Sequence, residues 1–219
     1  MSRRCYIAGA GEFDENTLPE SGDYIIAADG GYKSLTSRGI TPDLVVGDFD
    51  SLPADLLEAV SKHPNVVRCP VEKDDTDMML AVRQGLKRGY ETFIINGSLG
   101  GRLDQTLANI QILVYIAEKN ARGTLVGHEI CITTVRNGEI KFARAMPKGC
   151  VVSVFSAAGA AEGVTLKGLK YPLDNTTVTS SYPIGVSNEF TGEPAVISVK
   201  NGILIILIAA PMRLLLYPS

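Results

Sequence analysis

Short apolar runs alternate with helix-like segments along the first half of the chain. Five apolar runs predict β-strands, at residues 5–9, 24–28, 44–47, 66–69 and 93–96. Several of them lack the alternation of apolar and polar side chains that a solvent-exposed face would produce. Continuous apolar runs of this length are typical of strands covered on both faces, as in a parallel sheet.

Three segments between these runs predict helices. Residues 53–63 begin with a proline and carry an apolar stripe, and residues 76–88 end at Gly89. Residues 103–119 give the longest helical pattern, with apolar side chains at helical spacing: Leu107, Ile110, Leu113, Val114 and Ala117. This alternation of strands and helices predicts an α/β domain with a doubly wound, mostly parallel sheet.

The pattern changes near Gly123, beyond which no segment has convincing helical periodicity. β-rich runs follow instead, at residues 130–135, 140–143, 151–156, 178–180, 195–199 and 203–209. The dipeptides at 137–138 and 201–202 are both Asn-Gly, a strong hairpin signal between β-prone runs. We therefore expect an α/β domain over residues 1–128 and an all-β domain, most simply a sandwich, over residues 129–219.

The composition is that of an ordinary globular protein. The 219 residues include 21 basic and 24 acidic side chains, a formal net charge of −3. Without a basic excess we expect no nucleic-acid partner. The apolar run at residues 203–210 is shorter than the roughly 20 residues of a membrane span, so we expect no membrane partner. The four cysteines form no CxxC pair, which disfavours zinc and indicates free thiols in a cytoplasmic protein.

Acidic residues gather where the predicted strands end. The motifs are DGG at 29–31, GDFDS at 47–51 and KDDTD at 73–77. Ligands of open α/β sheets bind beyond the carboxyl ends of the strands. In an extended segment, Asp48 and Asp50 would present their carboxylates on one face. Oxygen ligands of this kind suit Mg²⁺, so this edge predicts a site for a magnesium–nucleoside triphosphate.

The alternative is that each acidic group only shapes the local backbone. Asp29 before two glycines is a common turn, and Thr76 or Asp77 before a helix is a common cap. The recurrence of these groups favours a site, because many carboxylates at one sheet edge would repel one another without a cation. That argument holds only if the strands are neighbours.

A glycine-rich segment, GSLGGRLDQ at residues 97–105, lies between a predicted strand and the longest predicted helix. Its glycines allow backbone N–H groups to approach a phosphate, and a helix N-terminus favours an anion. Arg102 is suited to bind phosphate oxygens bidentately. The alternative is a plain strand–helix turn in which Arg102 pairs with Asp104. The segment matches neither the Walker A nor the Rossmann fingerprint, which disfavours both of those sites.

Two motifs of the β-rich half contain residues suited to bind a heterocycle. Tyr171 lies beside a proline in GLKYPL at 168–173, and Ser187 and Asn188 lie in GVSNE at 185–189, which we expect to be a loop. Tyr171 is suited to stack on a heterocycle, and the other two side chains to hydrogen-bond its edge. Taken alone, such residues more often belong to a core edge and a turn.

Taken together and in order, these motifs resemble the thiamine pyrophosphokinase family, in its bacterial form. The resemblance covers nearly the whole chain. It implies an α/β catalytic domain, a β-sandwich that helps to bind thiamine, and a homodimer with each site at the junction between subunits. The implied reaction moves the β,γ-pyrophosphoryl group of ATP to the thiamine hydroxyl, giving thiamine diphosphate and AMP. At Gln105 many bacterial members would have His, so we assign this position no catalytic role.

The residues and the resemblance together suggest roles. We expect Asp48, Asp50 and Asp77 to bind Mg²⁺ and, with Arg102, to be catalytic. The expected nucleotide contacts are Asp29, Gly30, Gly31, Lys73, Gly97, Gly100, Gly101, Arg102 and Asp104. The expected acceptor-substrate contacts are Thr76, Asp77, Tyr171, Ser187 and Asn188. A carboxylate on Mg²⁺ is a poor base, so the group that accepts the hydroxyl proton is not assigned.

Three other functions stay open on the sequence. The first is a pyrophosphokinase for a pterin or another hydroxymethyl heterocycle, against which the motifs of the β-rich half argue. The second is a non-catalytic module that senses Mg–ATP, which the density of carboxylates disfavours. The third is a metal-dependent phosphohydrolase, which an acidic site would also support.

Overall fold

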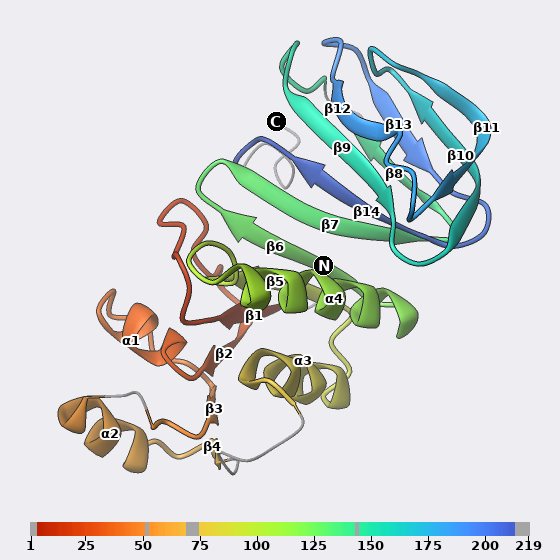
Figure 1. Cartoon of the computed structure of the whole chain (residues 1–219). Coiled ribbons are helices and arrows are strands. Elements are labelled where there is room, and N and C mark those ends of the chain that lie inside the picture. Colours follow the sequence, from red (N-terminus) through yellow and green to blue (C-terminus); the bar gives the residue numbers. More distant parts are fainter. Residues whose placement is uncertain (1–3, 51–52, 69–74, 143–144, 213–219) are drawn as a thin grey trace. The chain divides into compact units, whose positions relative to one another are not determined.

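The structure, a computed structural model, describes residues 4–50, 53–68, 75–142 and 145–212 (Figure 1). The chain divides into two compact units. The first unit comprises residues 1–112 and 125–127, and the second comprises residues 113–124 and 128–219. Helix α4 (Leu103–Glu118) and strand β6 (Arg122–Gly127) each contribute residues to both units.

The first unit is built on parallel strands in the order β5-β1-β2-β3-β4. These strands are β1 (Arg4–Ala8), β2 (Tyr24–Ala28), β3 (Leu44–Gly47), β4 (Val66–Arg68) and β5 (Thr92–Asn96). The helices of this part of the chain are α1 (Gly31–Thr36), α2 (Ala54–Ser61), α3 (Asp77–Lys87) and α4. The prediction of a mixed α/β domain with neighbouring parallel strands is confirmed.

Helix α3 shows how sequence and packing cooperate. Thr76 is its N-cap, and the Thr76 hydroxyl accepts a hydrogen bond from the Met79 N–H at 3.1 Å. The helix buries one face, and Gly85 lies on it. A Cβ at Gly85 would lie 2.5 Å from a ring carbon of Phe93 and 3.0 Å from the Cys5 sulfur. Gly85 therefore lets α3 pack closely on β5 and β1.

Helix α1 was not predicted, because Asp29-Gly30-Gly31 indicated only a turn. Gly31 is the first residue of this six-residue helix. A Cβ at Gly31 would lie 2.0 Å from the Ala8 carbonyl oxygen. Glycine at position 31 is therefore required by the close approach of α1 to the end of β1.

The second unit contains two groups of antiparallel strands. One has the order β12-β9-β14-β7, and the other the order β11-β10-β13-β8. The strands are β7 (Ile130–Arg136), β8 (Glu139–Phe142), β9 (Val151–Ser156), β10 (Ala160–Lys167), β11 (Leu173–Thr179), β12 (Gly185–Glu189), β13 (Ala195–Ser198) and β14 (Ile203–Ile208). Side chains of both groups share one buried cluster, which is the packing of a β-sandwich.

The two Asn-Gly turns do not form the hairpins that the sequence predicts. Residues 137–138 connect β7 with β8, and residues 201–202 connect β13 with β14, but each connection joins strands of different sheets. The two turns instead pair with each other. The Asn137 N–H donates to the Gly202 carbonyl oxygen at 3.1 Å, and the Gly202 N–H donates to Asn137 Oδ1 at 2.8 Å.

The segment 185–189, predicted as a loop, forms strand β12 on an edge of its sheet. Its small polar residues gave no β signal, and pairing with β9 decides its conformation. Strand β10 was also missed. Among the described residues, no helix is long and apolar enough to cross a membrane.

Candidate active site

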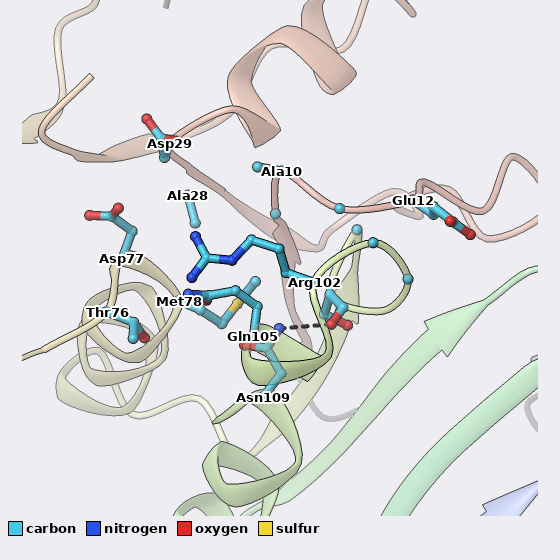
Figure 2. A pocket seen from close by; sticks show the side chains of 16 residues that line it. Ala10, Glu12, Ala28, Asp29, Thr76, Asp77, Met78, Arg102, Gln105 and Asn109 are labelled. Atoms are coloured by element: carbon cyan, nitrogen blue, oxygen red, sulfur yellow. Dashed lines mark hydrogen bonds between the residues drawn. The ribbon is translucent and has the colours of Figure 1, made fainter. Parts of the chain in front are cut away.

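A cavity of about 750 Å³ lies in the first unit, beyond the carboxyl ends of β1, β2 and β5 (Figure 2). Strand β1 lies between β2 and β5, so the chain order of the strands reverses there. The crevice at such a reversal is where open α/β sheets bind ligands. The position of the cavity therefore follows from the topology of the sheet.

Two glycine loops form walls of this cavity. The first loop is residues 9–12 after β1, and the second loop is residues 97–101 after β5. They pack backbone to backbone: the Gly11 N–H donates to the Gly97 carbonyl oxygen at 2.7 Å. A Cβ at Gly9 would lie 2.5 Å from the same oxygen, so no larger residue fits at position 9.

Arg102 is the cation of the cavity lining in the described residues, and it extends into the cavity (Figure 2). It immediately precedes α4, and its carbonyl oxygen accepts the helical hydrogen bond of Thr106 at 3.1 Å. Its guanidinium pairs with Asp104 at 2.5 Å. The pairing raises the pKa of Arg102 and lowers the pKa of Asp104. Because both side chains are exposed, a phosphate group can replace or join Asp104 at low cost.

Asp29 and Asp77 line the same cavity (Figure 2). Asp29 follows β2, and its N–H donates to the Val46 carbonyl oxygen of β3 at 2.8 Å. Its φ of 46° is left-handed, a conformation that Asp tolerates better than most residues. Asp77 is the first residue of α3, and its neighbour Thr76 also lines the cavity.

Asp48 and Asp50 are not among the residues that line this cavity. The expectation that they flank an extended residue is wrong, because Phe49 between them has a φ of 64° and a buried ring. The Asp50 N–H donates to Asp48 Oδ1 at 3.2 Å, which makes a tight turn. The residue before Asp48 lies against Asp29, because a Cβ at Gly47 would be 3.2 Å from the Asp29 Cα.

The carboxylates of this edge fit a magnesium ion that shares its ligands with a nucleotide. Within the described residues no three His, Cys, Asp or Glu side chains gather closely enough to enclose a metal by themselves. Mg²⁺ in nucleotide sites usually takes one or two carboxylates and completes its shell with phosphate and water. Asp29 and Asp77 on the cavity wall are two carboxylates, the number that such a site uses.

The other expected nucleotide contacts have mixed outcomes. Gly97, Gly100 and Gly101 line the cavity, whereas Gly30 and Gly31 do not. Lys73 lies outside the described residues. Asp104 also lies outside the cavity lining and contacts it through Arg102.

Sequence reasoning assigned no role to several lining residues. They are Gly9, Ala10, Gly11, Glu12, Ala28, Met78, Ser98, Gln105 and Asn109. Gly9 at the end of the first predicted strand and Gly11 just beyond it were the available signal for the first loop. Gln105 and Asn109 lie on α4, four residues apart, and therefore share the helix face that borders the cavity.

The three residues expected to contact a heterocycle lie in the second unit. Tyr171 is 57% exposed, and Ser187 is exposed with a left-handed φ of 56°. Asn188 is buried and uses its amide on the chain itself. Its Oδ1 accepts from the Tyr171 N–H at 2.9 Å, and its Nδ2 donates to the Tyr171 carbonyl oxygen at 2.7 Å. Asn188 thus uses its amide to hold the backbone of Tyr171.

Comparison with known proteins accounts for both units. Residues 16–125 match the family model of the thiamin pyrophosphokinase catalytic domain, and residues 137–204 match that of the thiamin pyrophosphokinase vitamin B1 binding domain. This chain belongs to the thiamin pyrophosphokinase family. The thiamine pyrophosphokinase of Bacillus subtilis is 31% identical over 198 residues, which are 90% of this chain and 89% of that protein.

Solved structures of this family agree with the fold. The crystal structure of the Bacillus subtilis thiamine pyrophosphokinase has a TM-score of 0.82 at 28% identity, covering 95% of this chain and 99% of that one. The enzyme of Geobacillus thermodenitrificans gives 0.79 at 27% identity, with 94% and 97% covered. A shorter match is to a 6-hydroxymethyl-7,8-dihydropterin pyrophosphokinase of Pyrococcus furiosus, 45% identical over 71 residues, or 31% of this chain and 30% of that protein.

Proposed function

We propose that this protein is a thiamine diphosphokinase, which transfers the pyrophosphoryl group of ATP to the hydroxyl of thiamine and releases AMP. The observation that carries the proposal is the presence of a catalytic-domain match and a vitamin B1 binding-domain match, in that order, in one chain. The cavity, with its glycine loops, one arginine and two aspartates, supplies the matching chemistry in the first unit.

We assign catalysis to a domain of residues 1–128 and thiamine binding to a domain of residues 129–219. We also infer that the first domain is doubly wound. The strand order β5-β1-β2-β3-β4 supports this, because right-handed crossovers in opposite directions place their helices on opposite faces of the sheet.

Within this proposal, phosphate charge is balanced by the chain and by magnesium. Arg102 and Lys73 offset charge on the transferring and leaving phosphates, and the second glycine loop offers backbone N–H groups. Asp48, Asp50 and Asp77 would hold Mg²⁺, with Asp29 as a further ligand. When bound, the ion would neutralise phosphate oxygens and align them for in-line attack. Thr76 is placed to contact phosphate or acceptor, since it lines the cavity.

The acceptor side belongs to the second domain in this proposal. Asn188 holds the backbone of Tyr171, whose exposed ring is available to stack on the thiamine heterocycle, and exposed Ser187 offers a hydroxyl. We further propose a cytoplasmic homodimer. Large exposed apolar side chains on the second unit support an interface there: Tyr182, Ile184 and Val186.

A second candidate acceptor is a hydroxymethyl pterin, which the 71-residue match to the Pyrococcus furiosus protein favours. That match covers less than a third of the chain, whereas the family matches span both units. We therefore rank thiamine first.

Product analysis tests the choice directly. The purified protein with Mg–ATP should convert thiamine to thiamine diphosphate with one AMP per turnover. Turnover of 6-hydroxymethyl-7,8-dihydropterin without turnover of thiamine would replace the proposal with the pterin function. Release of inorganic phosphate without a diphosphorylated acceptor would indicate a phosphohydrolase.

A further inference from the structure

The connection between β1 and β2, residues 9–23, joins neighbouring parallel strands without a helix. A parallel crossover usually contains a helix, which satisfies its own backbone polar groups. An irregular segment needs other partners, because a buried N–H or C=O without one is costly. Asp14 and Thr17 of this connection are only 1% and 8% exposed, so partners must come from the surrounding structure.

Asn96, the last residue of β5, supplies those partners with both ends of its fully buried amide. Its Oδ1 accepts from the Asp14 N–H at 2.8 Å. Its Nδ2 lies 2.9 Å from the carbonyl oxygens of Asp14 and Thr17, and 2.9 Å from Tyr6 Oη. Tyr6 Oη in turn donates to the Thr17 carbonyl oxygen at 2.7 Å. One side chain thus ties the whole connection to β5.

Asn96 also fixes the two glycine loops of the cavity. Its Oδ1 accepts a second hydrogen bond, from the Gly97 N–H at 2.8 Å, at the start of the second loop. Its backbone carbonyl accepts from the Gly9 N–H at 2.8 Å, at the start of the first loop. Asn96 is not among the residues that line the cavity. Its side chain therefore holds the start of the second loop and its backbone the start of the first, without reaching the ligand space.

A second buried amide holds the next residue of the same loop. Asn109 of α4 donates from Nδ2 to the Ser98 carbonyl oxygen at 2.7 Å (Figure 2). Gly97 and Ser98 are thus held by different elements, β5 and α4. The rest of the second loop, residues 99–101, starts from these two fixed residues, and backbone N–H groups held in a fixed loop need no rearrangement when charge develops on a phosphate.

We propose that Asn96 is a positioning residue for pyrophosphoryl transfer: it fixes the two glycine loops in the arrangement that receives the triphosphate. The inference rests on the proposed function of the cavity. Asn96 acts through the backbone of Gly9 and Gly97 and makes no contact with substrate.

The substitution Asn96→Leu tests this role, because it keeps the approximate shape of the side chain but removes Oδ1, which accepts from the Gly97 N–H at the start of the second loop. The Asp14 N–H loses the same acceptor. We expect a lower melting temperature and a fall in kcat of about tenfold or more, since small misplacements of positioning groups are costly. The KM for thiamine should change by less than about twofold, because uniform binding of the acceptor is not altered.

Thr17→Val is the matched control from the same network. The Thr17 hydroxyl donates to Asp14 Oδ2 at 2.6 Å and touches neither glycine loop. This variant should also lower the melting temperature, but kcat should stay within about twofold of the parent. Parental kinetic constants in Asn96→Leu would overturn the proposal, and so would an equal loss of kcat in Thr17→Val.

Two further measurements keep the test decisive. If Asn96→Leu does not fold, Asn96→Ser replaces it, because the shorter side chain also removes Oδ1 as acceptor of the Gly97 N–H, and an unchanged kcat in that variant would overturn the proposal. Calorimetric binding of Mg²⁺ with a non-hydrolysable ATP analogue separates this inference from the proposed function. Weaker binding by Asn96→Leu than by Thr17→Val supports the positioning role even if the parent makes no thiamine diphosphate, and equal binding by the two variants would overturn it.

Discussion

The lining of the cavity contains side chains of opposite charge. Asp29 and Asp77 are carboxylates on the wall that also carries Arg102. A site of this kind binds a polyphosphate only when a cation screens the carboxylates. The residues therefore differ in their expected effects: a carboxylate change should abolish metal-dependent transfer, and a change behind the wall should only weaken it.

Asp77→Asn should reduce transfer by about a hundredfold or more, because it removes one negative ligand for the metal. The fold should persist, since Thr76 still caps α3 and the lost charge at the helix N-terminus is worth about 0.3–1 kcal/mol. Steady-state kinetics and thermal melting check both statements. The control is Asp75→Asn, which breaks an ion pair with Arg83 and should keep most activity. Full activity of Asp77→Asn would remove Asp77 from the metal site.

Gly97→Ala should destabilise the protein by about 3 kcal/mol or more and inactivate it, through left-handed strain and overpacking together. Its φ is 68°, and a Cβ would lie 2.5 Å from the Gly9 carbonyl oxygen. Gly39 shares the left-handed φ, at 70°, but has open space around it. Gly39→Ala should therefore cost only about 1–2 kcal/mol of backbone strain and leave turnover intact. Similar losses in both variants, measured by denaturant unfolding, would contradict the crowding at Gly97.

The candidate residues found by sequence and by structure overlap only in part. Asp29, Asp77 and Arg102 could be found because strand ends and helix starts are visible as patterns. Asn96 and Asn109 could not, because each acts through contacts with backbone atoms distant in the sequence. The turn at Asp48 was also missed, because the local sequence contains no signal that Phe49 adopts a left-handed φ and buries its ring.

At the scale of elements, apolar runs predicted the five parallel strands to within about one residue, the usual uncertainty of element ends. Strands buried on both faces can be predicted because they appear in the sequence as continuous apolar runs. Two of the misses have a common cause: α1 and β12 owe their conformations to neighbours. The local sequence predicts a turn at Gly31, but the close approach to Ala8 decides its conformation. It likewise predicts a loop at residues 185–187, but pairing with β9 makes them a strand.

Helix α3 offers a test of element packing. Gly85→Ala should destabilise the first unit by about 1–3 kcal/mol, because the added methyl group meets Phe93 at 2.5 Å. Gln84→Ala, one residue earlier on the same helix, should change stability by about 0.5 kcal/mol or less. Chemical denaturation of both variants measures the difference. A stabilised Gly85→Ala, as helix propensity alone would give, would show that α3 packs less closely than described.

At the scale of the whole molecule, activity should depend on a divalent ion while folding should not. Chelation by EDTA is expected to abolish formation of thiamine diphosphate, and added Mg²⁺ to restore it. Because the carboxylates need phosphate to complete the ion's shell, the ion should bind together with the nucleotide and not to the free protein. Without nucleotide, the melting temperature should be insensitive to EDTA. A large drop on chelation alone would instead indicate a structural metal.

The two Asn-Gly turns changed the predicted topology of the second half. Each dipeptide correctly predicts a tight turn. Asn137 and Gly202 are hydrogen-bonded to each other, and each turn connects a strand of one sheet with a strand of the other. Local sequence specifies the turn, and only the completed sandwich core specifies which strands it joins.

The bond between Asp14 and Asn96 spans 82 residues of chain. One wall of the cavity is therefore synthesised long before the other, and closing so long a loop costs entropy before any contact offsets it. A nascent chain that ends before β5 has no cavity, so nucleotide cannot stabilise it. Ligand stabilisation, which acts only on the state that binds, begins once β5 has joined the sheet beside β1. The substrate of the finished enzyme thus becomes a folding ligand only for a nearly complete first unit.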